Sequence, residues 1–578
     1  MAKNIGTTDK LGATGLMSVI RTIIVTFMVG LSIGSVMAVV SNGFVEGVGW
    51  LAQKRNDFHF LEFKFHNFSF SLAPVICLLL AACAVIFIKK VFSITRYHGP
   101  ADSIYVAHHA GDEPEWKAGF GSTLAAFVSA SGGASVGQYG PLVHFGATVG
   151  SLLRRFTRGV LTTEIFLGCG VAGAIAAGFN APITGLVFAH EAILRNFSQK
   201  AIAPIAISSI TAAAVSEWAF GERNILGVSN IAPDLVQIMP YLLVSGPVFG
   251  LIAILFMVSL RSSARFAASS RLSSSQLILT AATICGLTGV FIPEILGLGT
   301  EAVNQMFAGE FEFNYLIVLL FAKIIMTAIC IGFGLFGGVF SPALFVGATG
   351  GAISTKIFTS IGLGSFGPAL AICGMAAIGA AVIGAPISTV LIVLEMTSSY
   401  EFAVAAMLSV VSCKIVSNVF YGHSFFDRQL LDRGIDISLG RSHINLMDMS
   451  VLTHVKTGTH QIFTKDSDIN SCVKILAERG LTEGYVVGDE ETFVGKIKIQ
   501  SLISKNTRKI IEIMDQSPLL IYNTDSVLDA IQKASNFVGE SIPVIEKSTN
   551  KLMGVIHEAD LFHAYLSMQN KTRDLETG

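Results

Sequence analysis

Long apolar segments separated by short polar ones run through the first three quarters of the chain. Residues 18–40, 72–88, 240–258 and 316–334 are examples, and each contains at most one charged residue. A helix needs roughly 20 apolar residues to cross a bilayer, so this pattern predicts several membrane-spanning helices. From residue 438 onward the pattern becomes that of short strands and amphipathic helices. We therefore expect an all-α polytopic membrane domain at 1–437 and a small soluble α/β domain at 438–578.

The composition agrees with a membrane protein. The chain is 52% hydrophobic and only 14% charged, against about 25% charged residues in a typical soluble domain. Its polar start lacks the apolar core of a signal peptide, so none is expected. The eight cysteines form no C-x-x-C pair and are predicted to be small core residues. A net charge of −1 gives no indication of nucleic-acid binding, and no enzyme motif occurs.

The distribution of basic residues predicts how the protein is oriented in the membrane. Clusters around Lys89, Arg154, Arg195 and Arg261 contrast with the loop 299–313, which has three glutamates and no base. Because basic loops stay on the cytoplasmic side, the polar C-terminal domain should also be cytoplasmic. The compact loops favour a plasma (inner) membrane location with several passes.

Two pairs of segments show an internal repeat. "GQYGPLVHFGATVG" (137–150) resembles "FSPALFVGATGG" (340–351), and "FNAPITGLVFAHE" (179–191) resembles "IGAPISTVLIVLE" (383–395). The repeat halves are placed at about 69–220 and 237–420. Inverted repeats in transport proteins position the substrate between the halves, on helices interrupted within the membrane.

Pro141 and Pro342 each follow a Gly-rich or irregular stretch, which predicts a helix that begins inside the bilayer. Such a start leaves backbone N–H groups unpaired at the positive end of the helix dipole. Two such starts would form an anion site. The alternative reading is that "GATVG" and "GATGG" serve only close helix packing. The duplication of both the proline and its lead-in favours the anion site.

The C-terminal domain is itself duplicated. Two units at about 445–503 and 515–568 each have the pattern of a strand, a helix and two strands.

These motifs together resemble the CLC family of chloride channels and chloride/proton exchangers. The matching segments are "GQYGP", "GGVFSP", "YHGPAD" and the two Ala-Pro-Ile helices, and the C-terminal domain resembles a pair of CBS domains. The resemblance implies two inverted-repeat halves with broken helices, followed by the α/β CBS pair. It also implies a homodimer in the lipid bilayer with one anion pathway per subunit. Chloride would be the transported ligand, and no cofactor would be required.

The resemblance also assigns site residues. The backbone N–H groups of Val339 and Phe340 would hold the central anion, with Phe426 where relatives have a tyrosine. His98 stands where a serine is common. The remaining positions of the predicted selectivity filter are Gly99, Gln138, Tyr139, Gly140 and Pro141.

Two positions depart from the exchanger pattern. The gating glutamate of the family is replaced by Tyr139, and the inner proton-relay glutamate by Ala192. A phenol with a reference pKa of about 10 is neutral at pH 7 and cannot carry protons as a carboxylate does. The departures predict an uncoupled chloride conductor gated by Tyr139. One hypothesis is that Tyr139 donates to the anion the hydrogen bond that Phe426 cannot. The alternative is that its ring only plugs the outer vestibule.

Other readings stay open at this point. A proton-coupled exchanger could use His144 or His190, although interior histidines are more often structural. Lys323 is expected to be paired structurally or to attract anions at long range. In related CBS pairs an aspartate of each unit binds the ribose of an adenine nucleotide. The second unit keeps this aspartate as Asp560, whereas the first unit has Ser501 at the corresponding position. At most one adenine nucleotide is therefore expected, bound weakly. The third reading is a CBS-based membrane sensor with little conduction.

Overall fold

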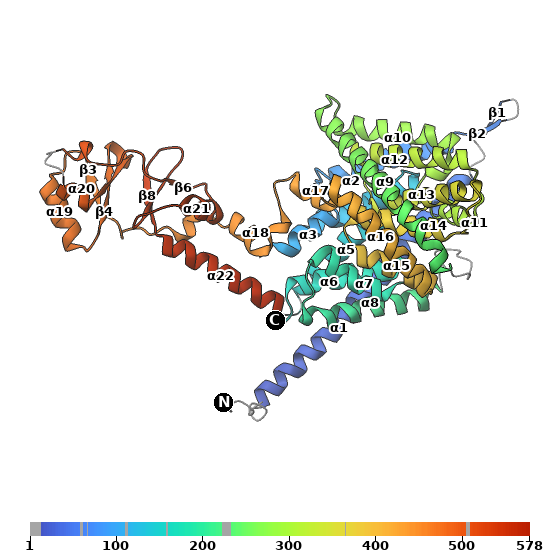
Figure 1. Cartoon of the computed structure of the whole chain (residues 1–578), viewed down its shortest axis with the longest axis horizontal. Coiled ribbons are helices and arrows are strands. Elements are labelled where there is room, and N and C mark those ends of the chain that lie inside the picture. The colour runs from blue at the N-terminus through green and yellow to red at the C-terminus, as the bar shows by residue number, and fades with distance from the viewer. Residues whose placement is uncertain are drawn as a thin grey trace. The chain divides into compact units, whose positions relative to one another are not determined.

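The structure is a computed structural model of the 578-residue chain. It describes residues 13–57, 62–65, 68–109, 114–155, 157, 160–221, 233–364, 366–504 and 509–577. Contacts divide the chain after Gly434 into a helical unit and a second, α/β unit that also includes the short segment at His108 (Figure 1). The predicted boundary lies at residue 437. The expectation about a signal peptide falls largely on residues 1–12, outside the described residues.

The first part of the helical unit contains a long entry helix, a short hairpin and the first repeat half. Its elements are α1 (Ala13–Asn56), β1 (Glu62–Phe65), β2 (Phe68–Ser71), α2 (Ala73–Val91), α3 (Pro100–His108), α4 (Trp116–Gly132), α5 (Tyr139–Arg154), α6 (Thr163–Phe179), α7 (Pro182–Phe188), a π-helical turn (Ala189–Leu194) and α8 (Gln199–Phe220). The hairpin was not predicted, and α1 extends well beyond the apolar segment 18–40.

The second half repeats this order. Its helices are α9 (Leu235–Ser269), α10 (Ser274–Phe291), α11 (Thr300–Ala308), α12 (Phe313–Gly332), α13 (Phe340–Ser360), α14 (Ala369–Ile383), α15 (Pro386–Thr397), α16 (Tyr400–Phe420) and α17 (Phe425–Leu431). Within the described residues, seven helices are long and apolar enough to cross a membrane. The shorter apolar helices are α6, α7, α14 and α15, and the repeated Ala-Pro-Ile segments supply α7 and α15. Short helices are expected where a helix starts or stops at membrane depth.

The Gly-rich repeats pack their helices in the same way in both halves. A Cβ atom on Gly146 of α5 would overlap the backbone of Gly170 on α6, and a Cβ on Gly347 of α13 would overlap the backbone of Gly374 on α14. Such glycines let two helices approach closely. In a membrane this packing is important because lipid provides no hydrophobic driving force for helix association. The packing interpretation of "GATVG" and "GATGG" is therefore correct, and it coexists with the helix starts described below.

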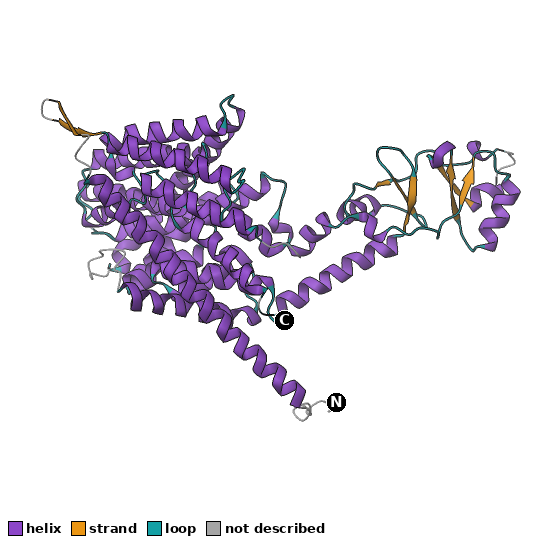
Figure 2. Cartoon of the chain, turned by 180° about the vertical axis from the view of Figure 1, so that it is seen from behind, coloured by secondary structure: helices purple, strands orange, loops and turns teal. Residues whose placement is uncertain are grey.

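The second unit contains two three-stranded sheets (Figure 2). In each, the first strand pairs parallel with the second, and the second pairs antiparallel with the third. A bulge interrupts the second pairing at Val486/Val487 and again at Val544/Ile545, so the predicted duplication extends to this irregularity. The elements are α18 (Arg441–Asp448), β3 (Ile462–Thr464), α19 (Ile469–Glu478), β4 (Glu483–Val487), β5 (Phe493–Lys498), α20 (Ile499–Ser504), β6 (Ile521–Tyr522), α21 (Val527–Ala534), β7 (Ile542–Ile545), β8 (Leu552–Ile556) and α22 (Glu558–Thr577).

Candidate anion pathway

The segments that lead into α5 and α13 lie side by side in the helical unit. The N–H of Gly137 donates to the carbonyl of Gly338 and the N–H of Gly338 donates back, each at 2.7 Å. This antiparallel bridge joins the two repeat halves at the point where both helices begin. The helices start at Tyr139 and Phe340, two residues before the prolines predicted to open them.

The starts of α5 and α13 have no side-chain cap. Pro141 and Pro342 stand in the first turn, where backbone N–H groups lack helical partners. The residues before each helix, Gln138 and Val339, are buried. The positive ends of two helices therefore meet, uncapped, inside the protein. The side-chain oxygen of Gln138 is also buried without a hydrogen bond.

Two other helices of the repeated segments, α7 and α15, are capped by carboxylates. Glu395 accepts from the N–H groups of Ile183 (2.8 Å) and Thr184 (2.7 Å) at the start of α7. At the start of α15, Glu191 accepts from the N–H groups of two residues at 2.8 and 2.7 Å. Each glutamate belongs to the half opposite the helix that it caps. Among the helices of the repeated segments, α7 and α15 therefore have carboxylate acceptors at their starts, whereas the starts of α5 and α13 have no side-chain cap.

A cavity of about 30 Å³ lies beside the segment that leads into α13 and the start of α3, and no residue of α5 is in its lining. A cavity needs about 10–15 Å³ of such volume to hold one water molecule. The cavity is therefore large enough for one small ion. Val339, Phe426 and Gly99 were predicted and line it. Its full lining is Tyr97, Gly99, Pro100, Asp102, Ile331, Gly337, Gly338, Val339, Phe425, Phe426, Gln429 and Arg433.

Tyr139 is turned toward the aromatic residues around it. Its ring stacks on Phe179 with centroids 3.8 Å apart and meets Phe340 edge-on at 5.5 Å. Its hydroxyl donates to the carbonyl of Gly178 at 3.2 Å. A phenol has one proton to donate. The hypothesis that Tyr139 donates to the anion is therefore wrong for this conformation, because Gly178 receives that proton.

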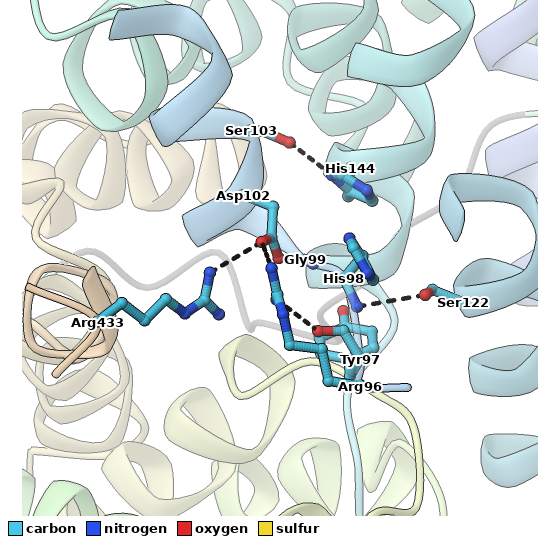
Figure 3. A network of polar contacts seen from close by, with 9 residues as sticks. All are labelled: Arg96, Tyr97, His98, Gly99, Asp102, Ser103, Ser122, His144 and Arg433. Atoms are coloured by element: carbon cyan, nitrogen blue, oxygen red, sulfur yellow. Dashed lines mark hydrogen bonds and ion pairs between the residues drawn. The ribbon is translucent and has the colours of Figure 1, made fainter. Parts of the chain in front are cut away.

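A polar network supports the start of α3 (Figure 3). Asp102 accepts from the Gly99 N–H at 2.9 Å and pairs with Arg96 (2.6 Å) and Arg433 (2.8 Å). The two arginines neutralise a largely buried carboxylate, which would otherwise repel an anion. The motif "YHGPAD" was recognised in the sequence, but no role was predicted for Asp102 or Arg433. The acid three residues after Gly99 was the available signal for a helix cap.

The two histidines nearest the anion pathway face each other in this network. The ring centroids of His98 and His144 are 6.1 Å apart, and His144 Nδ1 lies 2.9 Å from the Ser103 hydroxyl. The His98 backbone N–H donates to Ser122 at 3.2 Å. His98 is absent from the cavity lining, so its predicted contact with the anion is not visible in this conformation.

Comparison with known proteins identifies the family. The family model for voltage gated chloride channels matches residues 80–418, more than half of the chain. The chain belongs to this family. A CBS domain model matches residues 510–567, the second of the two C-terminal units.

The similar proteins include one that is named as a chloride channel protein and some that are named as chloride/proton exchangers. A protein of Ralstonia nicotianae named as a ClcB-like chloride channel protein is 28% identical over 318 residues, which is 53% of this chain and 73% of the relative. The H(+)/Cl(−) exchange transporter ClcA of Vibrio vulnificus is 29% identical over 318 residues, covering 52% and 67%. The crystal structure of a eukaryotic CLC transporter has the same fold, with a TM-score of 0.62, 20% identity, and coverage of 94% of this chain and 98% of that one.

The structure shows the surroundings of three further residues of the helical unit that the sequence analysis singled out. Ala192 is buried in the π-helical turn, directly after the capping residue Glu191. Lys323 is fully buried, and its ammonium donates to the Ile295 carbonyl at 2.9 Å. The structural pairing expected for Lys323 is therefore confirmed. His190 Nδ1 donates to the Asn196 carbonyl at 2.8 Å, which agrees with a structural histidine.

The predicted ribose-binding carboxylate of the CBS domain already has partners. Asp560 pairs with Lys456 at 2.8 Å and with His557 at 3.3 Å. Burial raises the pKa of Asp560, but the contacts with Lys456 and His557 outweigh burial and hold the pKa below its usual value. A nucleotide that used Asp560 would have to compete with Lys456. Ser501, at the corresponding position of the first CBS unit, lies in α20.

Replacing Gly178 by alanine should displace the Tyr139 ring. A Cβ atom there would lie 2.7 Å from Tyr139 Cε1. Glycine to alanine usually stabilises a helix, but here overpacking should destabilise the protein by about 1–3 kcal/mol. We expect a lower melting temperature in detergent for Gly178→Ala. The Gly178→Ala/Tyr139→Ala double variant should lose little more than Tyr139→Ala alone. Additive effects of the two substitutions would contradict the contact.

Proposed function

We propose that this protein conducts chloride passively across the membrane and that the conduction is not coupled to protons. The observation that carries the proposal is the meeting of two uncapped helix starts, α5 and α13, beside a cavity for one small ion. Backbone N–H groups and helix dipoles attract an anion. The two charged residues that line the cavity, Asp102 and Arg433, are paired with each other.

The absence of proton coupling rests on the groups at the entrance. Tyr139 holds the first position of α5, where relatives have the gating glutamate, and its proton is donated to Gly178. Ala192 supplies no titratable group. Asp102, the carboxylate in the cavity lining, is engaged by Arg96 and Arg433, so it is stabilised in the ionised form.

The assembly follows from family membership. We propose a homodimer with a separate chloride pathway in each subunit, in a plasma (inner) membrane and with the CBS pair on the cytoplasmic side. No cofactor is needed for conduction. An adenine nucleotide at Asp560 would bind weakly, because Lys456 occupies that carboxylate.

Proton-coupled chloride exchange is the second candidate. Some relatives are named exchangers, and the facing pair His98 and His144 is the titratable cluster nearest the helix starts. Histidine changes its charge near neutral pH, so this pair would have to carry the proton.

The test is the purified full-length protein in chloride-loaded liposomes, with chloride efflux and external pH recorded together. Chloride efflux without proton movement supports the proposal. Proton movement in a fixed ratio to chloride would establish exchange, and His144→Ala should then abolish the proton flux. Efflux no faster than from protein-free liposomes would overturn both candidates and leave the sensor reading.

A further inference from the structure

The hydroxyl group of Tyr97 is buried without a hydrogen-bond partner. Among the described residues, no group forms a hydrogen bond with this oxygen, although other atoms of Tyr97 are partly exposed. A buried hydroxyl left unpaired is costly, and in native proteins such a group needs an explanation. Tyr97 also lines the 30 Å³ cavity, together with Val339 and Phe426.

The Tyr97 ring is held firmly in position. It packs edge-on against Phe336, with ring centroids 5.5 Å apart. On its other side lies Gly99, where a Cβ atom would come within 2.6 Å of Tyr97 Cε1. A side chain at position 99 would therefore displace the ring. Figure 3 shows Tyr97 in the turn that precedes α3, next to Gly99 and the Asp102 network.

The Tyr97 hydroxyl lies where three helix starts converge. A Cβ atom on Gly140, in the first turn of α5, would lie 3.4 Å from this oxygen, 3.0 Å from Gly338 Cα and 3.6 Å from Pro100 Cδ. Gly338 leads into α13, and Pro100 opens α3. The free O–H is therefore next to the uncapped amides that are proposed to attract chloride.

The other aromatic residues of the site do not supply this donor. Phe426 has no hydroxyl, and the Tyr139 hydroxyl donates to Gly178. We propose that Tyr97 donates a hydrogen bond to the transported anion and so replaces the hydroxyl that relatives place at the position of Phe426. This inference rests on the proposed function, because it needs an anion in the pathway. It adds a selectivity residue to which the sequence motifs assigned no role, although Tyr97 opens the segment "YHGPAD".

The test compares Tyr97→Phe with one matched variant in the full-length protein. Tyr97→Phe keeps the ring and removes only the oxygen. Ser341→Ala removes another buried, unpartnered hydroxyl in the first turn of α13 that does not line the cavity. Chloride affinity is measured by isothermal titration calorimetry in detergent, and chloride flux is measured in liposomes.

We expect Tyr97→Phe to weaken chloride binding by about tenfold or more, since hydrogen bonds to charged groups are among the stronger ones. Ser341→Ala should keep the affinity of the unmodified protein. Unchanged affinity in Tyr97→Phe, with normal chloride conduction by the unmodified protein, would overturn the role of Tyr97 and leave the proposed function intact. Failure of the unmodified protein to bind or conduct chloride would overturn both.

A second measurement does not depend on a variant that folds. In crystals soaked in bromide, the anomalous signal should place an ion in hydrogen-bonding contact with the Tyr97 hydroxyl. A bromide ion at the starts of α5 and α13 but out of reach of this oxygen would reject the donor role.

Discussion

Replacing Tyr139 by glutamate should reduce chloride flux at neutral pH by about tenfold and make it dependent on pH. The carboxylate would stand at the first position of α5, where no side chain caps the backbone N–H groups. It would bind them as a competitor of chloride, because an anion at a helix start is stabilised by the helix dipole. As the pH falls through the pKa of the new carboxyl group, the competitor becomes neutral and the flux should recover. Liposome flux at several pH values measures this directly.

Tyr139→Gln is the matched control for that variant. Glutamine has nearly the same size as glutamate but stays neutral, so its flux should follow the pH dependence of the unmodified protein. Because both substitutions remove the ring stacked on Phe179, any shared change reports lost packing. Equal fluxes of the Glu and Gln variants at every pH would show that the start of α5 does not face the anion pathway.

Removal of either capping glutamate should unfold the helical unit or nearly so. Glu191 accepts from two backbone N–H groups of α15 and from the Ser388 hydroxyl at 2.6 Å. Glu395 does the same at α7, with the Thr184 hydroxyl at 2.6 Å. Each unpaired donor costs about 1–3 kcal/mol, and the membrane interior offers no water to replace the lost acceptor. Three such losses are a large share of the roughly 5–15 kcal/mol that stabilises a folded domain.

We therefore expect Glu191→Ala and Glu395→Ala to give little monodisperse protein on size-exclusion chromatography. Glu191→Gln retains one carbonyl oxygen, so its melting temperature should fall between those of Glu191→Ala and the unmodified protein. Glu217→Ala, which changes an exposed glutamate on α8, serves as the control and should behave like the unmodified protein. A normal melting temperature for both capping variants would contradict the proposed cross-capping.

The sequence predicted the features that arise from local chemistry. Apolar segment lengths predicted the membrane helices, and the prolines at 141 and 342 indicated helix starts to within two residues. The repeated Ala-Pro-Ile segments were recognised as helices, and these helices begin at Pro182 and Pro386. The strand and helix order of the C-terminal units was also correct. Each of these features depends on the length of an apolar stretch or on the preferences of a few neighbouring residues.

The tertiary structure decided which groups meet. Glu191 and Glu395 were recognised as repeated residues, but only the folded chain shows that each caps a helix of the other half. The hydroxyl of Tyr139 was expected to face the anion, whereas Gly178, on a neighbouring helix, receives its proton. Tyr97 opens the motif "YHGPAD" but was given no role, and the role proposed for it depends on Gly140 and Gly338, which are distant in the sequence. A single sequence specifies which donors exist, but the packing of distant segments determines which of them remain free for a ligand.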